Sequence, residues 1–250
     1  MNETLPPLAL LAGGLATRLL PVTASIPKSM VEVAGEPFIA HQLRLLSNGG
    51  VTTVVICSGH LGEQIEAFVG DGIRFGCHVR YSPDGGEPLG TGGAIKHALA
   101  LLGRQFMVMY GDSYLDAPFR AIYRAFCASA LPALITIYRN EDRWDKSNIE
   151  VVDGEIRRYD KVHRTPSMSH IDYGIGVFEA SVFEAWPSAV FDLADLYGRL
   201  AARRSLASYE VQQRFYETGS PEGLAETNAM LTRTRGHPRR AGGNGCDDNN

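Results

Sequence analysis

Near its N-terminus the chain carries a glycine pair and two basic residues, a combination suited to binding nucleotide phosphates. Residues 8–12 are apolar, Gly13 and Gly14 come next, and Thr17-Arg18 and Pro27-Lys28 follow. Paired glycines at the end of a buried strand let backbone N–H groups approach a nucleotide closely, and the arginine and lysine add fixed positive charge. We expect this segment to lie along a triphosphate.

The spacing of these residues excludes two commoner phosphate-binding motifs. G-x-G-x-x-G is not present because Leu15 and Thr17 fall between or after the glycines, and G-x-x-x-x-G-K-[ST] is not present because Pro27 precedes Lys28. A glycine pair alone is typical of an ordinary tight turn, and an isolated arginine is usually solvated. The interpretation therefore depends on motifs further along the chain.

Those motifs resemble a known family. Leu11-Ala12-Gly13-Gly14, Thr17-Arg18-Leu19 and Pro27-Lys28 resemble the signature of sugar-phosphate nucleotidyltransferases, which join a sugar 1-phosphate to a nucleoside triphosphate. The resemblance extends from about residue 8 to about residue 232. Within the family, the segments EPLGTGGA, IDYG, FDLADLY and FYETGSPEGL are most similar to bacterial D-glycero-D-manno-heptose 1-phosphate guanylyltransferases.

The resemblance implies a set of functional residues. It assigns nucleotide binding to Leu11, Ala12, Gly13, Gly14, Thr17, Glu87, Gly90 and Thr91. It assigns sugar-phosphate binding to Lys161, Asp172, Tyr173 and Gly174, and catalysis to Arg18, Lys28 and Asp112. It places Mg²⁺ on Asp112 and Glu217.

The implied chemistry needs no enzyme nucleophile, because an oxygen of the sugar phosphate attacks the α-phosphorus. Catalysis then comes from positioning and charge neutralisation. We assign Arg18 to the β- and γ-phosphates, Lys28 to the α-phosphate and the sugar phosphate, and Mg²⁺ to bridging these oxygens. An isolated Gly-Asp is also a common helix cap, which is the alternative for Asp112. Most relatives have Asp where this chain has Glu217, which leaves direct and water-mediated metal contact both open.

Substrate choice rests on two further sets of residues. The Glu87 carboxylate can accept the adjacent N1–H and N2–H donors of guanine, which favours GTP, although Glu87 is equally compatible with a solvated loop or with a uridylyltransferase. For the sugar, Asp172 can accept hydrogen bonds from hydroxyls. The alternatives to sugar binding are that Lys161 forms a surface ion pair and that Tyr173 packs in the core.

The order of apolar patterns predicts an α/β fold. Strand patterns at residues 8–12, 53–57, 78–82, 106–110 and 133–138 alternate with helical patterns at 38–46, 61–69, 92–102 and 118–128. This indicates a doubly wound, mainly parallel Rossmann-like sheet with helices on both faces. Residues 149–152 and 155–159 flank Asp153-Gly154 and predict a hairpin, which forms a small sugar-binding lobe. A strand at 171–178, a helix at 193–203, a strand at 206–211 and a final helix capped by Ser220 complete the chain.

Length and composition indicate one soluble domain. We expect a nucleotidyltransferase domain at residues 1–232, with a nucleotide-binding half at about 8–140 and a sugar-binding half at about 141–232, and a disordered tail at 233–250. The apolar run at 8–12 is too short to span a bilayer, and the net charge of −4 argues against nucleic-acid binding. We therefore expect a cytoplasmic protein without membrane or nucleic-acid partners, and a homo-oligomer stays open.

Cysteine spacing and the remaining function classes complete the sequence interpretation. Cys57, Cys77, Cys127 and Cys246 form no C-x-x-C pair, so we expect the first three to be buried apolar residues. Three alternatives to the heptose guanylyltransferase stay open. They are a uridylyl- or other nucleotidyltransferase for a hexose, amino-sugar or N-acetylmuramate 1-phosphate, a non-catalytic nucleotide-sugar sensor or regulatory subunit, and, more weakly, a nucleotide-binding dehydrogenase.

Overall fold

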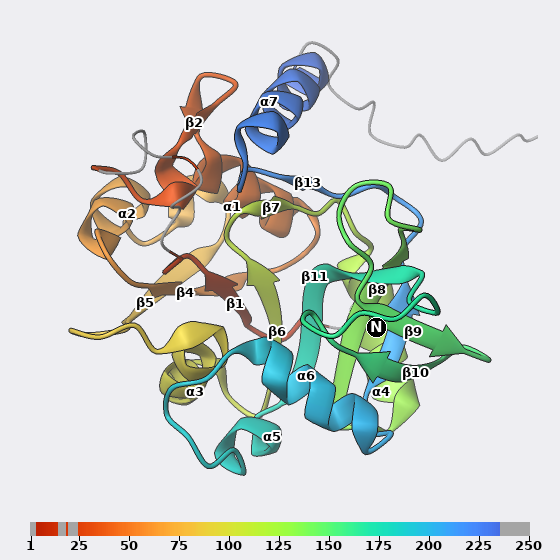
Figure 1. The fold of residues 1–250 in the computed structure, drawn as a ribbon. Helices are drawn as coiled ribbons and strands as arrows, with labels where there is room; N and C mark the ends of the chain where they lie inside the picture. The colour runs from red at the N-terminus through yellow and green to blue at the C-terminus, as the bar shows by residue number, and fades with distance from the viewer. Residues whose placement is uncertain (1–3, 15–18, 20–24, 236–250) are drawn as a thin grey trace, which may run out of the picture.

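A central mixed sheet with helices on both faces organises the chain (Figure 1). The computed structural model describes residues 4–14, 19 and 25–235. The main sheet contains β1 (Leu8–Leu11), β4 (Thr53–Ser58), β5 (His78–Pro83), β6 (Gln105–Tyr110), β8 (Ala133–Arg139), β9 (Ile149–Val152), β10 (Glu155–Tyr159), β11 (His170–Glu179) and β12 (Ala207–Glu210). The predicted α/β sheet with helices on both faces is confirmed.

The sheet divides into a parallel part and a mixed part. The order β10-β9-β11-β6-β1-β4-β5 is parallel from β6 to β5, whereas β11 runs antiparallel to β6. β8 pairs with β11, and β12 pairs with β8 in parallel. Ligands in open parallel sheets bind beyond the carboxyl ends of the strands, so the ends of β1 and β6 mark the expected position of the site.

Alternate residues of the buried strand β1 supply two separate cores. Leu8 and Leu10 face one core and Ala9 and Leu11 face the other, as expected for side chains that alternate across a strand. The first core is covered by α1 (Phe38–Asn48), α2 (Gly62–Val69) and α4 (Phe119–Ser129). The second is covered by α3 (Gly90–Leu102), α5 (Ser181–Glu184) and α6 (Leu193–Ala202).

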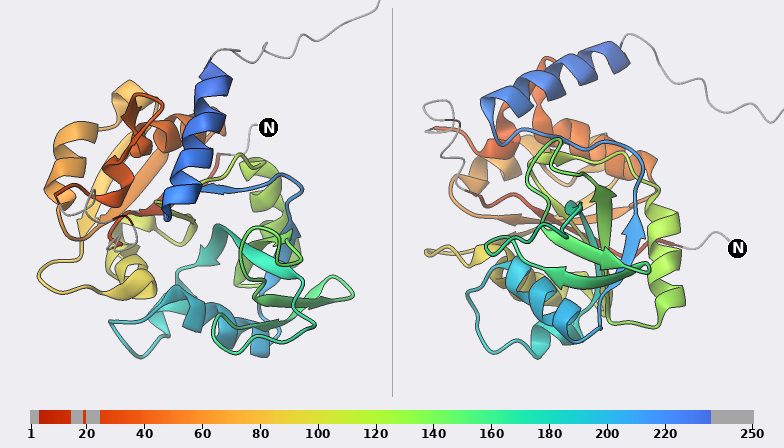
Figure 2. Two further views of the ribbon diagram at one scale, coloured as in Figure 1. Left: turned by 45° about the horizontal axis from the view of Figure 1, so that its top comes forward. Right: turned by 45° about the vertical axis from the view of Figure 1, so that its right-hand side comes forward.

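Short elements and the last helix lie beside the sheet. They are the 3₁₀ helices η3 (Lys28–Met30) and η4 (Ile73–Phe75) and the short strands β2 (Glu32–Val33), β3 (Glu36–Pro37), β7 (Ser113–Tyr114) and β13 (Tyr216–Glu217). Helix α7 (Pro221–Arg235) lies over β2 at one end of the molecule, where Leu231 packs against Val33 and Phe38 (Figure 2). The Asn228 side chain accepts a hydrogen bond from the Ala34 N–H there, over 2.7 Å.

The structure confirms the predicted hairpin, in which β9 and β10 pair antiparallel across a two-residue turn. Asp153 and Gly154 both have positive φ, 53° and 78°, as a two-residue turn between twisted strands requires. The hairpin does not stand apart from the sheet, because Ile149 of β9 pairs with His170 of β11. The hairpin therefore extends the central sheet beyond β11.

One sequence expectation, on the cysteines, needs correction. Helix α7 continues past residue 232 to Arg235, and residues 236–250 of the expected tail lie outside the described part. Cys57 and Cys77 are buried as expected, but Cys127 is exposed. It follows Phe126 on α4, and its position on the helix faces solvent because the buried stripe is formed by Phe119, Ile122 and Phe126.

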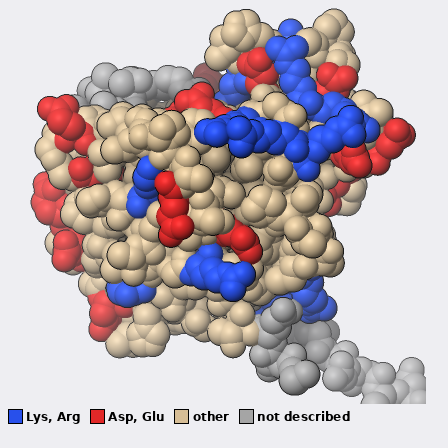
Figure 3. Space-filling view, turned by 90° about the horizontal axis from the view of Figure 1, so that it is seen from below, with Lys and Arg blue, Asp and Glu red and all other residues tan. Residues whose placement is uncertain are grey.

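The surface carries charges of both signs. On the face seen from below, Lys and Arg gather in a band while Asp and Glu lie beside it among uncharged side chains (Figure 3). Such mixing does not create a field of one sign over this face. Among the described helices, none is long and apolar enough to cross a membrane.

Candidate active site

A cavity of about 330 Å³ lies at the carboxyl ends of β1 and β6, beside the start of α3. Its lining includes many of the residues singled out in the sequence: Leu11, Ala12, Gly13, Gly14, Lys28, Gly90, Thr91 and Asp112. Other lining residues were not predicted, namely Ser29, Cys57, Asp84, Pro88, Ala94, Tyr110 and Gly111. Arg18 and Thr17 lie outside the described residues.

Lys28 and Asp112 form the polar centre of this cavity. Lys28 opens η3 after Pro27, and Asp112 follows β6 by two positions. The Lys28 Nζ lies 2.5 Å from the Asp112 Oδ2, with the side chains 14% and 33% exposed. The Asp112 Oδ1 accepts a hydrogen bond from the Ser113 hydroxyl over 3.1 Å. A charge pair in the wall of a cavity, held by two structured segments, is a preorganised site for polar ligand groups.

The two glycines after β1 have different surroundings. A Cβ at Gly13 would lie 3.0 Å from the backbone nitrogen of Gly59, so the fold itself requires this close approach. A Cβ at Gly14 would meet nothing within 4 Å, and Gly14 borders the cavity. Gly13 therefore packs two loops together, whereas Gly14 leaves the cavity wall open for a ligand.

The loop between β5 and α3 places Asp84, rather than Glu87, in the cavity wall. Glu87 is exposed and is not among the lining residues, whereas Asp84 lines the cavity close to Gly13. Burial raises the pKa of the Asp84 carboxyl, an effect opposed by the hydrogen bond from the Leu89 N–H. Sequence reasoning missed Asp84 because only Glu87 belonged to the recognised motif, although both acidic residues lie in the same glycine-rich loop.

The start of α3 is closed by a segment from the second half of the chain. The N–H groups of Gly92 and Gly93 both donate to the Phe191 carbonyl, over 3.0 and 3.2 Å. The Thr91 hydroxyl accepts a hydrogen bond from the Leu193 N–H over 2.8 Å. The first N–H groups of a helix need partners, and here they find them across the two halves of the protein.

Glu217, the second predicted metal ligand, is occupied elsewhere. Its Oε1 accepts a hydrogen bond from the Ser220 hydroxyl over 2.6 Å, and its Oε2 accepts one from the Gly219 N–H. The Ser220 Oγ in turn accepts a hydrogen bond from the Gly223 N–H over 3.0 Å, which confirms Ser220 as the cap of α7. Glu217 does not line the cavity, and the described residues contain no group of three His, Cys, Asp or Glu suited to a metal.

A divalent cation therefore fits Asp112 better than it fits the predicted pair. The Asp112 carboxylate lies in the cavity wall and is one-third exposed, which suits a hard cation that takes its remaining ligands from phosphate and water. The Glu217 carboxylate has both oxygens committed to the start of α7. Of the two predicted metal ligands, therefore, only Asp112 lies in the cavity wall.

Two of the predicted sugar residues, Asp172 and Tyr173, point to opposite faces of β11. The Asp172 carboxylate accepts hydrogen bonds from the Tyr159 hydroxyl over 3.1 Å and from the Gly174 N–H over 3.0 Å. Burial raises its pKa, and the nearby Lys161 charge opposes that shift. Tyr173 faces the other way: it is 2% exposed and packs in the first core with Leu115. Tyr173 therefore has the core position given above as its alternative, because neighbouring side chains on a strand point to opposite faces.

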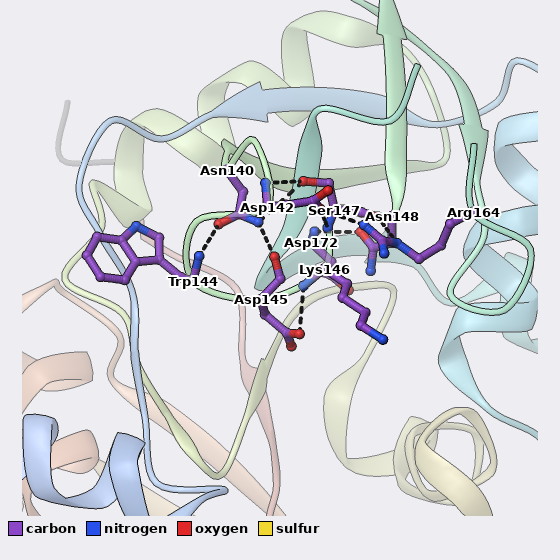
Figure 4. A network of polar contacts seen from close by, with 9 residues as sticks. All are labelled: Asn140, Asp142, Trp144, Asp145, Lys146, Ser147, Asn148, Arg164 and Asp172. Carbon is purple, nitrogen blue, oxygen red and sulfur yellow. Dashed lines mark hydrogen bonds and ion pairs between the residues drawn. The ribbon is translucent and has the colours of Figure 1, made fainter. Parts of the chain in front are cut away.

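A polar network holds the Asp172 region in place (Figure 4). The Asn148 Oδ1 accepts a hydrogen bond from the Asp172 N–H over 3.1 Å. The loop before it is fixed by Ser147, whose N–H donates to the Asp142 Oδ1 over 2.7 Å. The Arg164 Nε donates to the Ser147 carbonyl over 2.8 Å. Sequence reasoning missed this loop, and its run of Asn, Asp and Ser side chains able to bond to the backbone was the available signal.

Comparison with known proteins identifies the family. Residues 9–185 match the sequence profile of the nucleotidyl transferase family. The chain belongs to this family. A solved structure of HddC from Yersinia pseudotuberculosis, complexed with GMP-PN, superposes with a TM-score of 0.75 over 91% of this chain and all of that one, at 24% identity. A UDP-glucose pyrophosphorylase complexed with UDP-glucose also has a TM-score of 0.75, over 92% of this chain and all of that one, at 20% identity. Identities this low establish a shared fold.

Curated relatives differ in nucleotide and sugar. An N-acetylmuramate alpha-1-phosphate uridylyltransferase from Neisseria meningitidis is 41% identical over 130 residues, which are 52% of this chain and 55% of that one. A glucose-1-phosphate thymidylyltransferase from Streptomyces griseus is 27% identical over 90% of this chain and 65% of its own. A mannose-1-phosphate guanyltransferase from Hypocrea jecorina is 26% identical over 85% of this chain and 60% of its own. The chain spans between about half and two thirds of the length of these relatives.

Proposed function

We propose that the protein transfers a nucleotidyl group from a nucleoside triphosphate to a sugar 1-phosphate. The observation that carries this proposal is the Lys28–Asp112 pair in a cavity at the ends of β1 and β6, beside the glycine pair. An oxygen of the sugar phosphate forms a bond to the α-phosphorus. The bond from that phosphorus to the oxygen bridging to the β-phosphate breaks, and pyrophosphate leaves with the electron pair.

The chain's own residues contribute charge and position rather than covalent chemistry. Lys28, which lines the cavity, is proposed to neutralise the α-phosphate and the sugar phosphate. Arg18 is proposed to bind the β- and γ-phosphates, as the motif resemblance implies. Asp112 would hold Mg²⁺, which when bound neutralises phosphate charge. Cys57 lines the cavity, but burial raises the pKa of its thiol to about 12, so it is not poised as a nucleophile.

GTP is the favoured nucleotide because the cavity wall offers a carboxylate. Guanine presents N1–H and N2–H side by side, and a carboxylate can accept both. Asp84 supplies such a group within the cavity, and Glu87 lies on the same loop. The HddC complex with GMP-PN and the mannose-1-phosphate guanyltransferase support this choice, whereas the uridylyl- and thymidylyltransferase relatives make UTP and dTTP the competing nucleotides.

For the acceptor we favour a manno-configured heptose 1-phosphate, on the motif resemblance described above. Lys161 and Asp172 are proposed to bind its phosphate and a ring hydroxyl. N-acetylmuramate 1-phosphate is the second candidate, because the Neisseria relative is 41% identical in its matched segment. A sensor without catalysis is disfavoured by the Lys28–Asp112 pair, which a nucleotide-binding regulator does not need.

The test is pyrophosphate release with Mg²⁺, with each of GTP, UTP, CTP, dTTP and ATP paired with heptose, mannose, glucose and N-acetylmuramate 1-phosphates. We expect turnover with GTP and a heptose 1-phosphate. Asp84→Asn should lower kcat/KM for GTP by roughly 10- to 100-fold, because it loses one acceptor for guanine. Glu87→Gln is the matched variant on the exposed part of the loop. No turnover with any pair despite nucleotide binding would contradict the proposed function.

A further inference from the structure

The strongest unexplained feature outside the residues assigned above is the hydroxyl of Tyr110. Tyr110 is the last residue of β6, two positions before Asp112, and its side chain lines the cavity. Its hydroxyl oxygen is buried and has no hydrogen-bond partner among the described residues. Buried hydroxyls in folded proteins nearly always have a partner, so an unpartnered one in a cavity wall indicates that a ligand or water supplies it.

The groups around Tyr110 are those of the sugar side of the site. The Lys161 Nζ lies 5.6 Å from the centre of the Tyr110 ring. A Cβ at Gly174, the residue whose N–H donates to the Asp172 Oδ1, would lie 3.4 Å from the Tyr110 Cδ2. A phenol hydroxyl can both donate and accept a hydrogen bond. Tyr110 thus connects the nucleotide cavity with Lys161 and Asp172, which do not themselves line it.

A bulge in β11 makes room for this tyrosine. The register of β11 against β8 shifts between Asp172 and Gly176, and Gly174 within the bulge has a φ of 105°. A Cβ at Gly174 would lie 3.4 Å from the Tyr110 Cδ2 and 3.0 Å from the Leu115 Cδ1. The same bulge directs the Gly174 N–H to the Asp172 Oδ1. One backbone irregularity therefore positions both the Tyr110 ring and the Asp172 carboxylate, as is usual for bulges beside active sites.

We propose that Tyr110 is a specificity-determining residue, whose hydroxyl binds one ring hydroxyl of the sugar 1-phosphate beside Asp172. This rests on the proposed function and deepens it. The phenol can exchange donor and acceptor roles with a neutral sugar hydroxyl, while Asp172 accepts a further hydrogen bond from the sugar. A sugar that lacks this hydroxyl leaves the Tyr110 oxygen buried without a partner, and such sites discriminate strongly against the deoxy analogue.

The test compares Tyr110→Phe with wild type on the sugar 1-phosphate that wild type uses best, and on its 2-, 3-, 4- and 6-deoxy forms. We expect the KM of the variant for the parent sugar to rise roughly tenfold, with the KM for the nucleotide within about twofold. Wild type should lose activity with one deoxy analogue, and for that analogue the variant should lose nothing further. The midpoint of thermal unfolding should not fall, because the change removes only an unpartnered oxygen.

Tyr123→Phe is the matched control, because the Tyr123 hydroxyl donates to the Gln105 Oε1 over 2.9 Å, on α4 and outside the cavity lining. Asp172→Asn provides a second variant, which should weaken binding of the same sugar 1-phosphate. An active wild type that treats all deoxy analogues alike, or an unchanged KM in Tyr110→Phe, would overturn the inference. A wild type inactive with every sugar 1-phosphate would instead overturn the proposed function.

Discussion

The Nζ of Lys28 lies 2.5 Å from the Oδ2 of Asp112, although the two residues are 84 positions apart in the chain. Lys28 comes from a short 3₁₀ helix in the loop after β1, and Asp112 from the end of β6, the strand that pairs with β1. Parallel pairing of β1 with β6 brings their carboxyl ends to one edge of the sheet, and with them these two loops. The pair holds opposite charges in the wall of the cavity where the proposed reaction would bring phosphate charge.

Loss of either member of this pair should abolish most turnover. We expect Lys28→Met and Asp112→Asn each to lower kcat by about 10²- to 10³-fold, because preorganised charge near a transferred phosphoryl group contributes that much. The double variant should lose little more than either single one, because the two residues act as a unit. Steady-state pyrophosphate release measures this, with circular dichroism to confirm folding. Near-normal turnover in either variant would contradict the assignment.

The sequence predicted the fold and the nucleotide side of the cavity more fully than the sugar side. Gly13, Lys28, Gly90 and Asp112 belong to short motifs placed where strands end, and parallel-strand geometry alone brings such ends together. Asp84 was not predicted because a loop's local conformation decides which of two nearby carboxylates faces a cavity. Periodicity carries no information on that choice.

The sugar side depended on a backbone detail that patterns do not report. The β11 bulge at Gly174 decides where Asp172 and Tyr110 lie, and Tyr173 follows the ordinary alternation into the core. Glu217 shows the same limit. Its motif indicated a metal ligand, but Ser220 and the Gly219 N–H at the start of α7 compete for its carboxylate.

Glu217 should therefore act mainly on stability. Glu217→Ala leaves the Gly219 N–H and the Ser220 hydroxyl without their acceptor, and we expect it to lower the free energy of unfolding by about 1–2 kcal/mol. Urea unfolding measures the loss, with Glu222→Ala as the control because Glu222 is exposed in the first turn of the same helix. The Mg²⁺ concentration for half-maximal activity separates the two roles: it should rise in Asp112→Asn but not in Glu217→Gln. A rise in Glu217→Gln with unchanged stability would restore Glu217 as a metal ligand.

The half-buried Asp172 should make stability depend on pH. Its pKa in the folded protein is raised above the ordinary 3.8, chiefly by burial, so the folded state binds more protons than the unfolded state just above that pH. This contribution to stability is present at low pH and is lost as pH rises through the raised pKa. The unfolding free energy of Asp172→Asn, relative to wild type, should therefore increase between pH 4 and pH 7.5. Asp195→Asn, an exposed carboxylate on α6, is the control. An unchanged or falling difference would show that Asp172 titrates like a solvated carboxyl.

The contact between Thr91 and Leu193 should couple the two halves of the protein. The Leu193 N–H donates to the Thr91 hydroxyl at the first turn of both α3 and α6, and Thr91 also lines the cavity. Thr91→Val keeps the side-chain shape but removes the acceptor, and an N–H left without a partner in a part-buried contact costs about 1–3 kcal/mol. We expect urea unfolding to show that loss together with a raised KM for the nucleotide.

The hydroxyl alone accounts for both effects, so Thr91→Ser should restore most of the lost stability and affinity. Thr232→Val is the matched control. Among the contacts described, the exposed Thr232 hydroxyl bonds only to the Asn228 carbonyl within its own helix. If Thr91→Val is as stable as wild type, the Thr91 hydroxyl does not hold the halves together. A variant that loses stability while its nucleotide KM is unchanged would mean that the contact is structural and does not position the cavity wall.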